Sequence, residues 1–181
     1  ATARRAPRPP SALSLLSFAS PCYHRRSQRS ACVLPWSHPL PTHSLQVIAH
    51  RGASAYAPEN TWASFDLGLQ IGADAIETDV RATSDGRLAL IHDASLDRTT
   101  NGRGPVKEAP WEVVSALDAG AWFNPRFAGA RVPLLEPTLA RYAARVPFAI
   151  EIKQPGIEAA VLTAIRDSGA RATVTAFEFE T

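Results

Sequence analysis

Charged side chains stand two residues apart at two points of the chain. Glu77 and Asp79 lie in the run Ala-Ile-Glu-Thr-Asp-Val, and Glu151 and Lys153 lie in Ala-Ile-Glu-Ile-Lys. Both runs have the composition of strands, in which alternate residues share a face, so each pair projects to one side. Two carboxylates side by side repel each other unless a cation lies between them. Carboxylate oxygens suit Mg²⁺ or Ca²⁺ better than zinc, so Glu77 and Asp79 indicate a site for a divalent cation.

Two histidines follow short apolar runs. His50 comes after Val-Ile-Ala and precedes Arg51, and His92 comes after Leu-Ala-Leu-Ile. Histidine titrates near neutral pH, so one of the two can be the base that activates a nucleophile and the other the acid that protonates a leaving oxygen. Arg51 and Lys153 add fixed positive charge suited to phosphate oxygens. With a cation that neutralises a phosphate, these residues predict phosphate-ester chemistry.

Each residue also has a reading without catalysis. A histidine at a strand end is more often a satisfied polar residue than a catalyst. Glu77 and Asp79 by themselves can be a solvated edge or a pair of salt bridges. Glu151 and Lys153 by themselves can be a simple ion pair on one face. The functional reading is favoured because the residues occur jointly at the ends of successive predicted strands, where parallel α/β sheets and barrels place their ligands.

From Gln46 onward, short apolar runs alternate with amphipathic stretches, a pattern typical of βα units and a parallel sheet. The runs predict five strands, at 47–49, 73–80, 88–91, 148–153 and 172–177. The helical spacing of apolar residues predicts helices over 62–69, 136–144 and 157–168. The first of these helices follows the start signal Pro58-Glu59-Asn60-Thr61 and stops at Gly72.

Residues 94–135 interrupt this rhythm. They contain Asn101-Gly102 and Gly104-Pro105, which are turn sequences, and an aromatic run, Trp-Phe-Asn-Pro, at 122–125. A short helix is predicted near 111–117. We interpret 94–135 as a long connection or small insertion after the third predicted strand.

The first 44 residues differ from the rest, and we expect them to be a disordered leader ahead of a domain over 45–181. They hold six Arg, no acid and seven of the fifteen prolines. Taking these six from the 19 Lys and Arg leaves 13 basic against 17 acidic side chains, so the domain is mildly acidic. The basic excess therefore gives no reason to expect a nucleic-acid partner for the domain. Cys22 and Cys32 also lie in the leader, so they supply the domain with neither a disulfide nor a catalytic thiol.

The leader has three interpretations. Residues 11–20 are faintly similar to the apolar core of a signal peptide, whereas the Arg- and Ser-rich composition is more similar to an organelle transit peptide. Because the chain has no initiating Met, the segment can also be other than natural coding sequence. No run approaches the ~20 apolar residues of a membrane-spanning helix. These features do not define a compartment, with the cytoplasm slightly favoured.

Seven motifs stand in one order between about residues 46 and 177. They closely resemble those of the glycerophosphodiester phosphodiesterase family. The motifs are His50-Arg51-Gly52-Ala53, Pro58-Glu59-Asn60-Thr61, Glu77-Thr78-Asp79, Thr83-Ser84-Asp85-Gly86, His92-Asp93, Leu96-Asp97-Arg98-Thr99-Thr100 and Glu151-Ile152-Lys153.

The resemblance implies an α/β fold, a (β/α)₈ TIM barrel with a small insertion after the third strand. It departs slightly at Thr175-Ala176-Phe177, where the family usually has Ser-Phe. Five strands are predicted where the family's barrel has eight, so we expect a barrel truncated after the fifth strand, in an incomplete gene or a fragment. The resemblance also implies the roles of the site residues: catalytic His50 and His92, phosphate contacts Arg51 and Lys153, and Glu77, Asp79 and Glu151 as ligands of one Mg²⁺ or Ca²⁺.

The expected activity is metal-dependent hydrolysis of a glycerophosphodiester to glycerol 3-phosphate and an alcohol, with a small-molecule substrate as the partner. Attack by water and attack by a substrate hydroxyl to form a cyclic phosphate both fit the residues. One alternative is a related lipid phosphodiesterase of the phospholipase C-like or sphingomyelinase D-like kind. Another is a non-catalytic remnant that only binds a metal or phosphate. Oligomeric state is not predicted.

Overall fold

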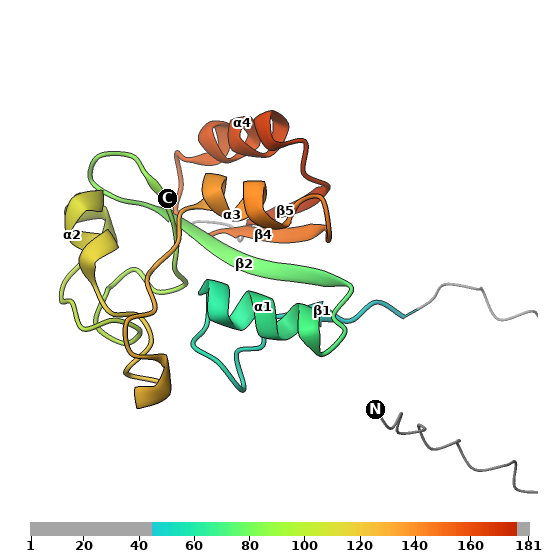
Figure 1. Cartoon of the computed structure of the whole chain (residues 1–181). Helices are drawn as coiled ribbons and strands as arrows, with labels where there is room; N and C mark the ends of the chain where they lie inside the picture. The colour runs from blue at the N-terminus through green and yellow to red at the C-terminus, as the bar shows by residue number, and fades with distance from the viewer. Residues whose placement is uncertain (1–44, 177–181) are drawn as a thin grey trace, which may run out of the picture. The chain divides into compact units, whose positions relative to one another are not determined.

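The computed structural model describes residues 45–176 (Figure 1). The leader with its two cysteines, and Phe177 of the fifth predicted strand, lie outside the described residues. In chain order the elements are β1 (Ile48–Ala49), α1 (Trp62–Gln70), β2 (Ala75–Ala82), β3 (Leu88–Leu90), the 3₁₀ turn η1 (Val106–Glu108), α2 (Trp111–Ala116), the 3₁₀ turn η2 (Pro125–Phe127), α3 (Leu135–Tyr142), β4 (Phe148–Ile152), α4 (Glu158–Ser168) and β5 (Ala172–Ala176).

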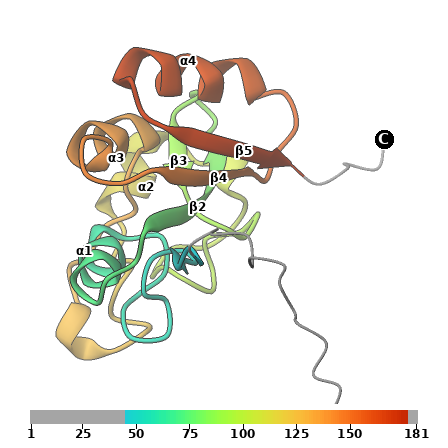
Figure 2. The same ribbon diagram turned by 90° about the vertical axis from the view of Figure 1, so that its right-hand side faces the viewer.

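The strands β1, β2, β4 and β5 form a parallel sheet in that order. Parallel neighbours need a crossover connection, usually a helix. Helix α1 supplies it between β1 and β2, and α4 supplies it between β4 and β5. Figure 2 shows α1, α3 and α4 along the outer side of this curved sheet. The predicted parallel α/β architecture is therefore confirmed over the described residues.

The third predicted strand does not join the parallel sheet as another βα unit. β3 pairs with the end of β2 in antiparallel register, with Val80 opposite Leu90. The cause is the short connection over residues 83–87, which reverses the chain at Gly86 and leaves no room for a crossover. All five predicted strands are present in one sheet, but only four of them are parallel, so the expectation that residues 88–91 continue the parallel sheet is wrong over the described residues.

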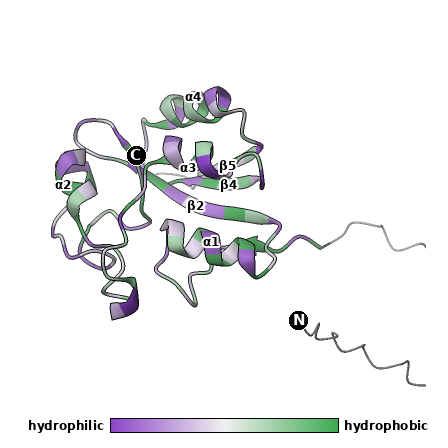
Figure 3. Cartoon of the chain, in the orientation of Figure 1, coloured by the Kyte–Doolittle hydropathy of each residue, from purple (hydrophilic) through white to green (hydrophobic). Residues whose placement is uncertain are grey.

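The main core lies between the sheet and its helices. Phe65 of α1 packs edge-on against Tyr142 of α3, with ring centroids 6.0 Å apart, and both are fully buried. Apolar residues of β2 and β4, such as Ile76 and Ile150, face the same cluster. Figure 3 shows β2 changing from hydrophobic at its start to hydrophilic further along. One face of the strand, with Ile76, Val80 and Ala82, stays in the core along its length, and the polar side chains Glu77, Asp79 and Arg81 alternate with these residues on the other face.

The segment 94–135 forms a second, small core together with Ala89 and Ile91 at β3. Leu96, Val106 and Val114 are fully or almost fully buried there, and Trp111 packs against them. The short helix predicted near 111–117 is confirmed as α2. This segment stands between β3 and α3, so it interrupts the βα alternation as the sequence predicts. The helices predicted at 62–69, 136–144 and 157–168 are confirmed within two residues at either end. Over residues 45–176, every helix is too short or too polar to cross a bilayer.

Gly52 lies in the loop after β1 and packs against Ser64 of helix α1. It has a positive φ of 80°, and a Cβ placed there would lie 2.3 Å from Ser64 Oγ and 2.6 Å from the Ser64 carbonyl carbon. Ser64 Oγ donates a hydrogen bond to the Arg51 carbonyl oxygen at 2.9 Å, so the close approach fixes the loop that carries Arg51. Only glycine fits this position without moving the helix.

We expect Gly52→Ala to lower the free energy of unfolding by roughly 2–4 kcal/mol, because it adds overlap with backbone to the strain of a positive φ. Chemical denaturation measures this. Gly72→Ala is the matched control: it has φ 96° but nothing within 4 Å, so only the strain remains, about 1 kcal/mol. Equal losses in the two variants would contradict the account.

Candidate active site

Three carboxylates meet on one face of the neighbouring strands β2 and β4. Glu77 and Asp79 share one face of β2, and Glu151 lies opposite Asp79 in the parallel register. Oxygens of the three side chains lie within 4.8 Å of one another. The alternation of side chains along a strand predicts that Glu77 and Asp79 share a face. The register between β2 and β4 brings Glu151 to the same cluster. The cluster has the oxygen donor set that Mg²⁺ and Ca²⁺ prefer.

Two cations compensate this charge. Lys153 Nζ lies 3.4 Å from Asp79 Oδ1 and also pairs with Glu151, and Arg51 Nε lies 3.2 Å from Asp79 Oδ2. Asp79 Oδ1 is buried and accepts no hydrogen bond, so the Lys153 contact is electrostatic and leaves a carboxylate lone pair without a donor. A buried oxygen of this kind fits a metal ligand. The donor set and this oxygen together fit one divalent cation held by Glu77, Asp79 and Glu151.

The loop after β1 wraps around the carboxylates. Arg51 has a φ of 55°, and its backbone N–H donates to Glu77 Oε2 at 2.7 Å. Asn60, also at φ 55°, donates from Nδ2 to Asp79 Oδ2 at 2.9 Å. It accepts at Oδ1 from the Thr78 hydroxyl at 2.8 Å. Two left-handed residues are therefore held in place by their bonds to β2.

The carboxyl group of Glu77 has an unusual pKa. Burial is the largest cause, and the charge of Asp79 adds to it, against the opposing effect of the Arg51 N–H and guanidinium, so that the pKa of Glu77 rises to about 7. The ionised form is disfavoured because burial takes the charge out of water beside another carboxylate. A divalent cation in the cluster would reverse this preference.

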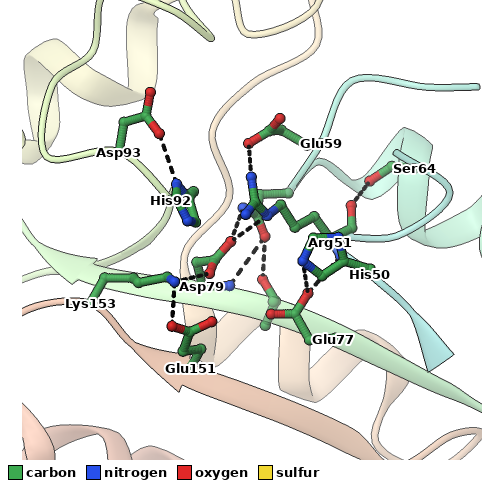
Figure 4. A network of polar contacts seen from close by, with 12 residues as sticks. His50, Arg51, Glu59, Ser64, Glu77, Asp79, His92, Asp93, Glu151 and Lys153 are labelled. Carbon is green, nitrogen blue, oxygen red and sulfur yellow. Dashed lines mark hydrogen bonds and ion pairs between the residues drawn. The ribbon is translucent and has the colours of Figure 1, made fainter. Parts of the chain in front are cut away.

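The two histidines lie on opposite sides of the carboxylates (Figure 4). His50 is exposed, and its Nε2 lies 4.0 Å from Glu77 Oε2. His92 is partly buried, and its Nδ1 lies 2.8 Å from Asp93 Oδ1. An acceptor carboxylate at Nδ1 favours a proton on that nitrogen, which leaves Nε2 as the ring atom able to exchange a proton with a substrate.

Arg98 links the two sides of this arrangement. Its guanidinium donates to both oxygens of Glu59 at 2.8 Å and to both oxygens of Asp93 at 2.6 and 2.9 Å. The hydrogen bonds with Arg98 hold the pKa of Asp93 well below its usual range. Burial raises the pKa of Glu59, but Arg98 and Arg51 outweigh it and leave that pKa lowered. The positions of Arg51 and His92 are thus connected through Glu59, Arg98 and Asp93.

The structure brings together all the site residues that the sequence predicts. Their side chains surround one cluster, and Figure 4 labels each of them. Sequence reasoning assigned no role to Asn60, Asp93 or Arg98, although all three stand in the quoted motifs. The signal was available, since a carboxylate directly after a histidine and an Arg five residues further on are polar groups beside a candidate catalytic residue. Their partners could not be predicted because Glu59 and Asp93 are far apart in sequence.

The fold and the cluster define a parallel α/β protein with a candidate divalent-metal centre. A model of the glycerophosphoryl diester phosphodiesterase family matches residues 50–172. The chain therefore belongs to the glycerophosphoryl diester phosphodiesterase family.

Relatives and solved structures agree with this membership. The chain is 46% identical over 127 residues to a glycerophosphodiester phosphodiesterase of Caldanaerobacter subterraneus, covering 67% of this chain and 52% of that protein. The crystal structure of glycerophosphodiester phosphodiesterase from Agrobacterium tumefaciens superposes with a TM-score of 0.72 at 44% identity, over 75% of this chain and 59% of that one. The structure of a phosphodiesterase from Oleispira antarctica, in complex with the product sn-glycerol-3-phosphate, superposes with a TM-score of 0.68 at 32% identity. The superposition covers 75% of this chain and 58% of that one.

These likenesses confirm the predicted (β/α)₈ barrel class, of which β1, β2, β4 and β5 form part. The chain spans about half the length of the curated relatives it matches, between 40% and 52% for three of them.

Metal binding should depend on pH through Glu77. At pH 6 its carboxyl group is mostly protonated, because its pKa is about 7, so a cation must displace the proton. We expect Mg²⁺ binding to release close to one proton at pH 6 and to be roughly tenfold weaker there than at pH 8. Calorimetry in buffers of different ionisation enthalpy measures both quantities. Glu77→Gln, the control, should bind more weakly and release no proton, and equal wild-type affinity at the two pH values would refute the expectation.

Removing Arg98 should destabilise the fold. Its side chain is 43% exposed, so solvent screens the ion pairs, and we expect Arg98→Ala to cost about 1–2 kcal/mol at pH 7. Arg103→Ala is the control, because the Arg103 side chain is 83% exposed and forms one ion pair, with its Nη1 3.5 Å from Asp97 Oδ1. It should cost under about 0.5 kcal/mol. Denaturant unfolding measures both.

The Arg98 effect also has a predicted pH dependence. The folded-state pKa values of Asp93 and Glu59 are lowered, so their stabilisation is present above the unfolded pKa of about 4 and is lost as the pH falls through the folded values. The difference in free energy of unfolding between wild type and Arg98→Ala should therefore become smaller as the pH falls below about 4. If this difference in free energy of unfolding stayed constant down to pH 2, the ion pairs of Arg98 with Glu59 and Asp93 would not be its cause.

Proposed function

We propose that the chain carries the catalytic centre for metal-dependent hydrolysis of glycerophosphodiesters to glycerol 3-phosphate and an alcohol. The observation that carries the proposal is the cluster of Glu77, Asp79 and Glu151 flanked by two histidines on opposite sides (Figure 4). Membership of the family supports it. So does the Oleispira antarctica relative, whose structure contains sn-glycerol-3-phosphate.

The carboxylates would hold one Mg²⁺ or Ca²⁺, which supplies charge neutralisation at the phosphate oxygens when bound. Arg51 and Lys153 already border the cluster, within 3.2 and 3.4 Å of Asp79. Their cationic groups can therefore hold phosphate oxygens on either side of the carboxylates. Buried contacts fix both side chains, so little reorganisation is needed when a substrate binds.

The histidines divide the proton transfers. With Asp93 Oδ1 as acceptor 2.8 Å from His92 Nδ1, the proton would stay on Nδ1 and His92 can exchange a proton with the substrate through Nε2. His50 stands across the carboxylates, beside Glu77. An acid and a base on opposite sides suit displacement at phosphorus, where the nucleophile and the leaving oxygen lie on opposite sides of the reacting atom.

The activity is tested by incubating the chain with a panel of glycerophosphodiesters and Mg²⁺ or Ca²⁺, with sn-glycerol 3-phosphate measured by a coupled dehydrogenase. We expect release that a chelator abolishes. Intact lipid vesicles serve as the comparison for a lipid phosphodiesterase. Metal binding without any turnover would favour a non-catalytic remnant and overturn the proposal.

His92→Ala should lower kcat by roughly 10²–10⁴-fold, the contribution of one general acid or base. Steady-state kinetics measures it, and circular dichroism with Mg²⁺ calorimetry checks that folding and metal binding survive. Asp93→Asn should give a smaller loss and shift the neutral ring away from the Nδ1–H tautomer, visible in ¹⁵N chemical shifts. A folded, metal-binding His92→Ala variant with near wild-type kcat would remove His92 from the mechanism.

A further inference from the structure

A surface pocket lies beside the carboxylate cluster and shares Lys153 with it. Two stretches of the insertion, 94–95 and 105–107, form one wall, the turn 153–155 after β4 forms the other, and Arg81 of β2 lies between them. We call this hollow the insertion pocket. Its volume is about 590 Å³, which lies within the range of roughly 300–1,000 Å³ typical of small-molecule sites.

The insertion pocket is continuous with the proposed catalytic centre. Lys153 lines it and also contacts Asp79 at 3.4 Å. Arg81 donates to the His92 carbonyl oxygen at 2.8 Å and to the Lys153 carbonyl oxygen at 2.7 Å. The guanidinium therefore ties the backbone of a proposed acid or base to the backbone beside a proposed metal ligand. A phosphate held by the cation and by Lys153 would direct one ester arm toward this hollow, because Lys153 borders both.

The charged side chains that line the insertion pocket are all basic. Arg81, Lys107 and Lys153 are cationic, and the residues that line this hollow include neither an acid nor an aromatic ring. Lys153 is paired with Asp79 and Glu151 of the neighbouring cluster, so Lys107 and Arg81 carry most of the positive charge that a head group would meet here. Proteins commonly recognise quaternary ammonium groups with aromatic faces, and carboxylates attract them by charge. Cationic side chains repel an ammonium group and donate hydrogen bonds to hydroxyl or anionic oxygens. Ser95 and Gln154 add further polar groups to the two walls.

We propose that the insertion pocket receives the head-group alcohol of the substrate and selects uncharged or anionic polyhydroxy head groups over the cationic amines choline and ethanolamine. This inference rests on the proposed function. In the hydrolysis, the bond from phosphorus to the head-group oxygen breaks, the oxygen of water bonds to phosphorus, and a proton passes to the departing oxygen. The alcohol then leaves through the insertion pocket, past Lys107.

The first test compares kcat/KM for glycerophosphoglycerol and glycerophosphocholine. We expect the wild-type ratio to favour glycerophosphoglycerol by about tenfold or more, and Lys107→Glu to reduce that ratio at least roughly threefold. Lys107→Ala should reduce it by less. Arg103→Glu is the matched control, since Arg103 is an exposed cation of the same insertion that does not line the pocket, and it should leave the ratio within about twofold.

A second test does not need turnover. Titration with myo-inositol 1-phosphate, followed by amide NMR, should shift the signals of Ser95 and Lys107 more than titration with phosphocholine does. If no glycerophosphodiester is hydrolysed, the proposed function fails while this binding test still decides the selectivity of the pocket. Preference for the choline compounds, or equal effects of Lys107→Glu and Arg103→Glu on the ratio, would overturn the inference.

Discussion

The charge of Asp79 has to be balanced inside the protein, because its side chain is fully buried in the middle of β2. Glu77 stands on the same face of that strand, and Glu151 lies opposite in register on β4. An uncompensated carboxylate there would cost several kcal/mol, so the surrounding chain is committed to supplying donors and cations. Arg51, Asn60 and Lys153 supply them, from the loops after β1 and β4.

This requirement explains features that would otherwise be costly. Arg51 and Asn60 both adopt left-handed backbone angles, which are uncommon for residues other than glycine, and a hydrogen bond to β2 offsets the cost at each position. The loop between them packs tightly on α1 at Gly52, where the helix comes too close for a Cβ. The same loop carries Glu59, whose contacts with Arg98 reach Asp93 and His92. The polar centre and the packing of the first helix thus depend on one another.

The hairpin at β3 gives the insertion its importance. Because the chain turns back on β2 instead of crossing over, His92 comes to lie above the carboxylates without belonging to the parallel sheet. The insertion that follows packs against β3 in a second small core, so it can present Lys107 to the insertion pocket from a folded support. One segment therefore carries a proposed acid or base and one wall of the insertion pocket.

The sequence alone was sufficient for the parallel α/β class, the boundaries of the main helices and the membership of each predicted residue in one polar centre. These follow from local periodicity, from the alternation that puts Glu77 and Asp79 on one face, and from ordered motifs. It misjudged the role of residues 88–91, since an apolar run looks the same in a hairpin as in a barrel strand and only the five-residue connection before it distinguishes the two. Tertiary structure alone decided that Glu151 lies opposite Asp79 and that Arg98 joins Glu59 to Asp93, because these pairings depend on strand register and on distances between residues far apart in the chain.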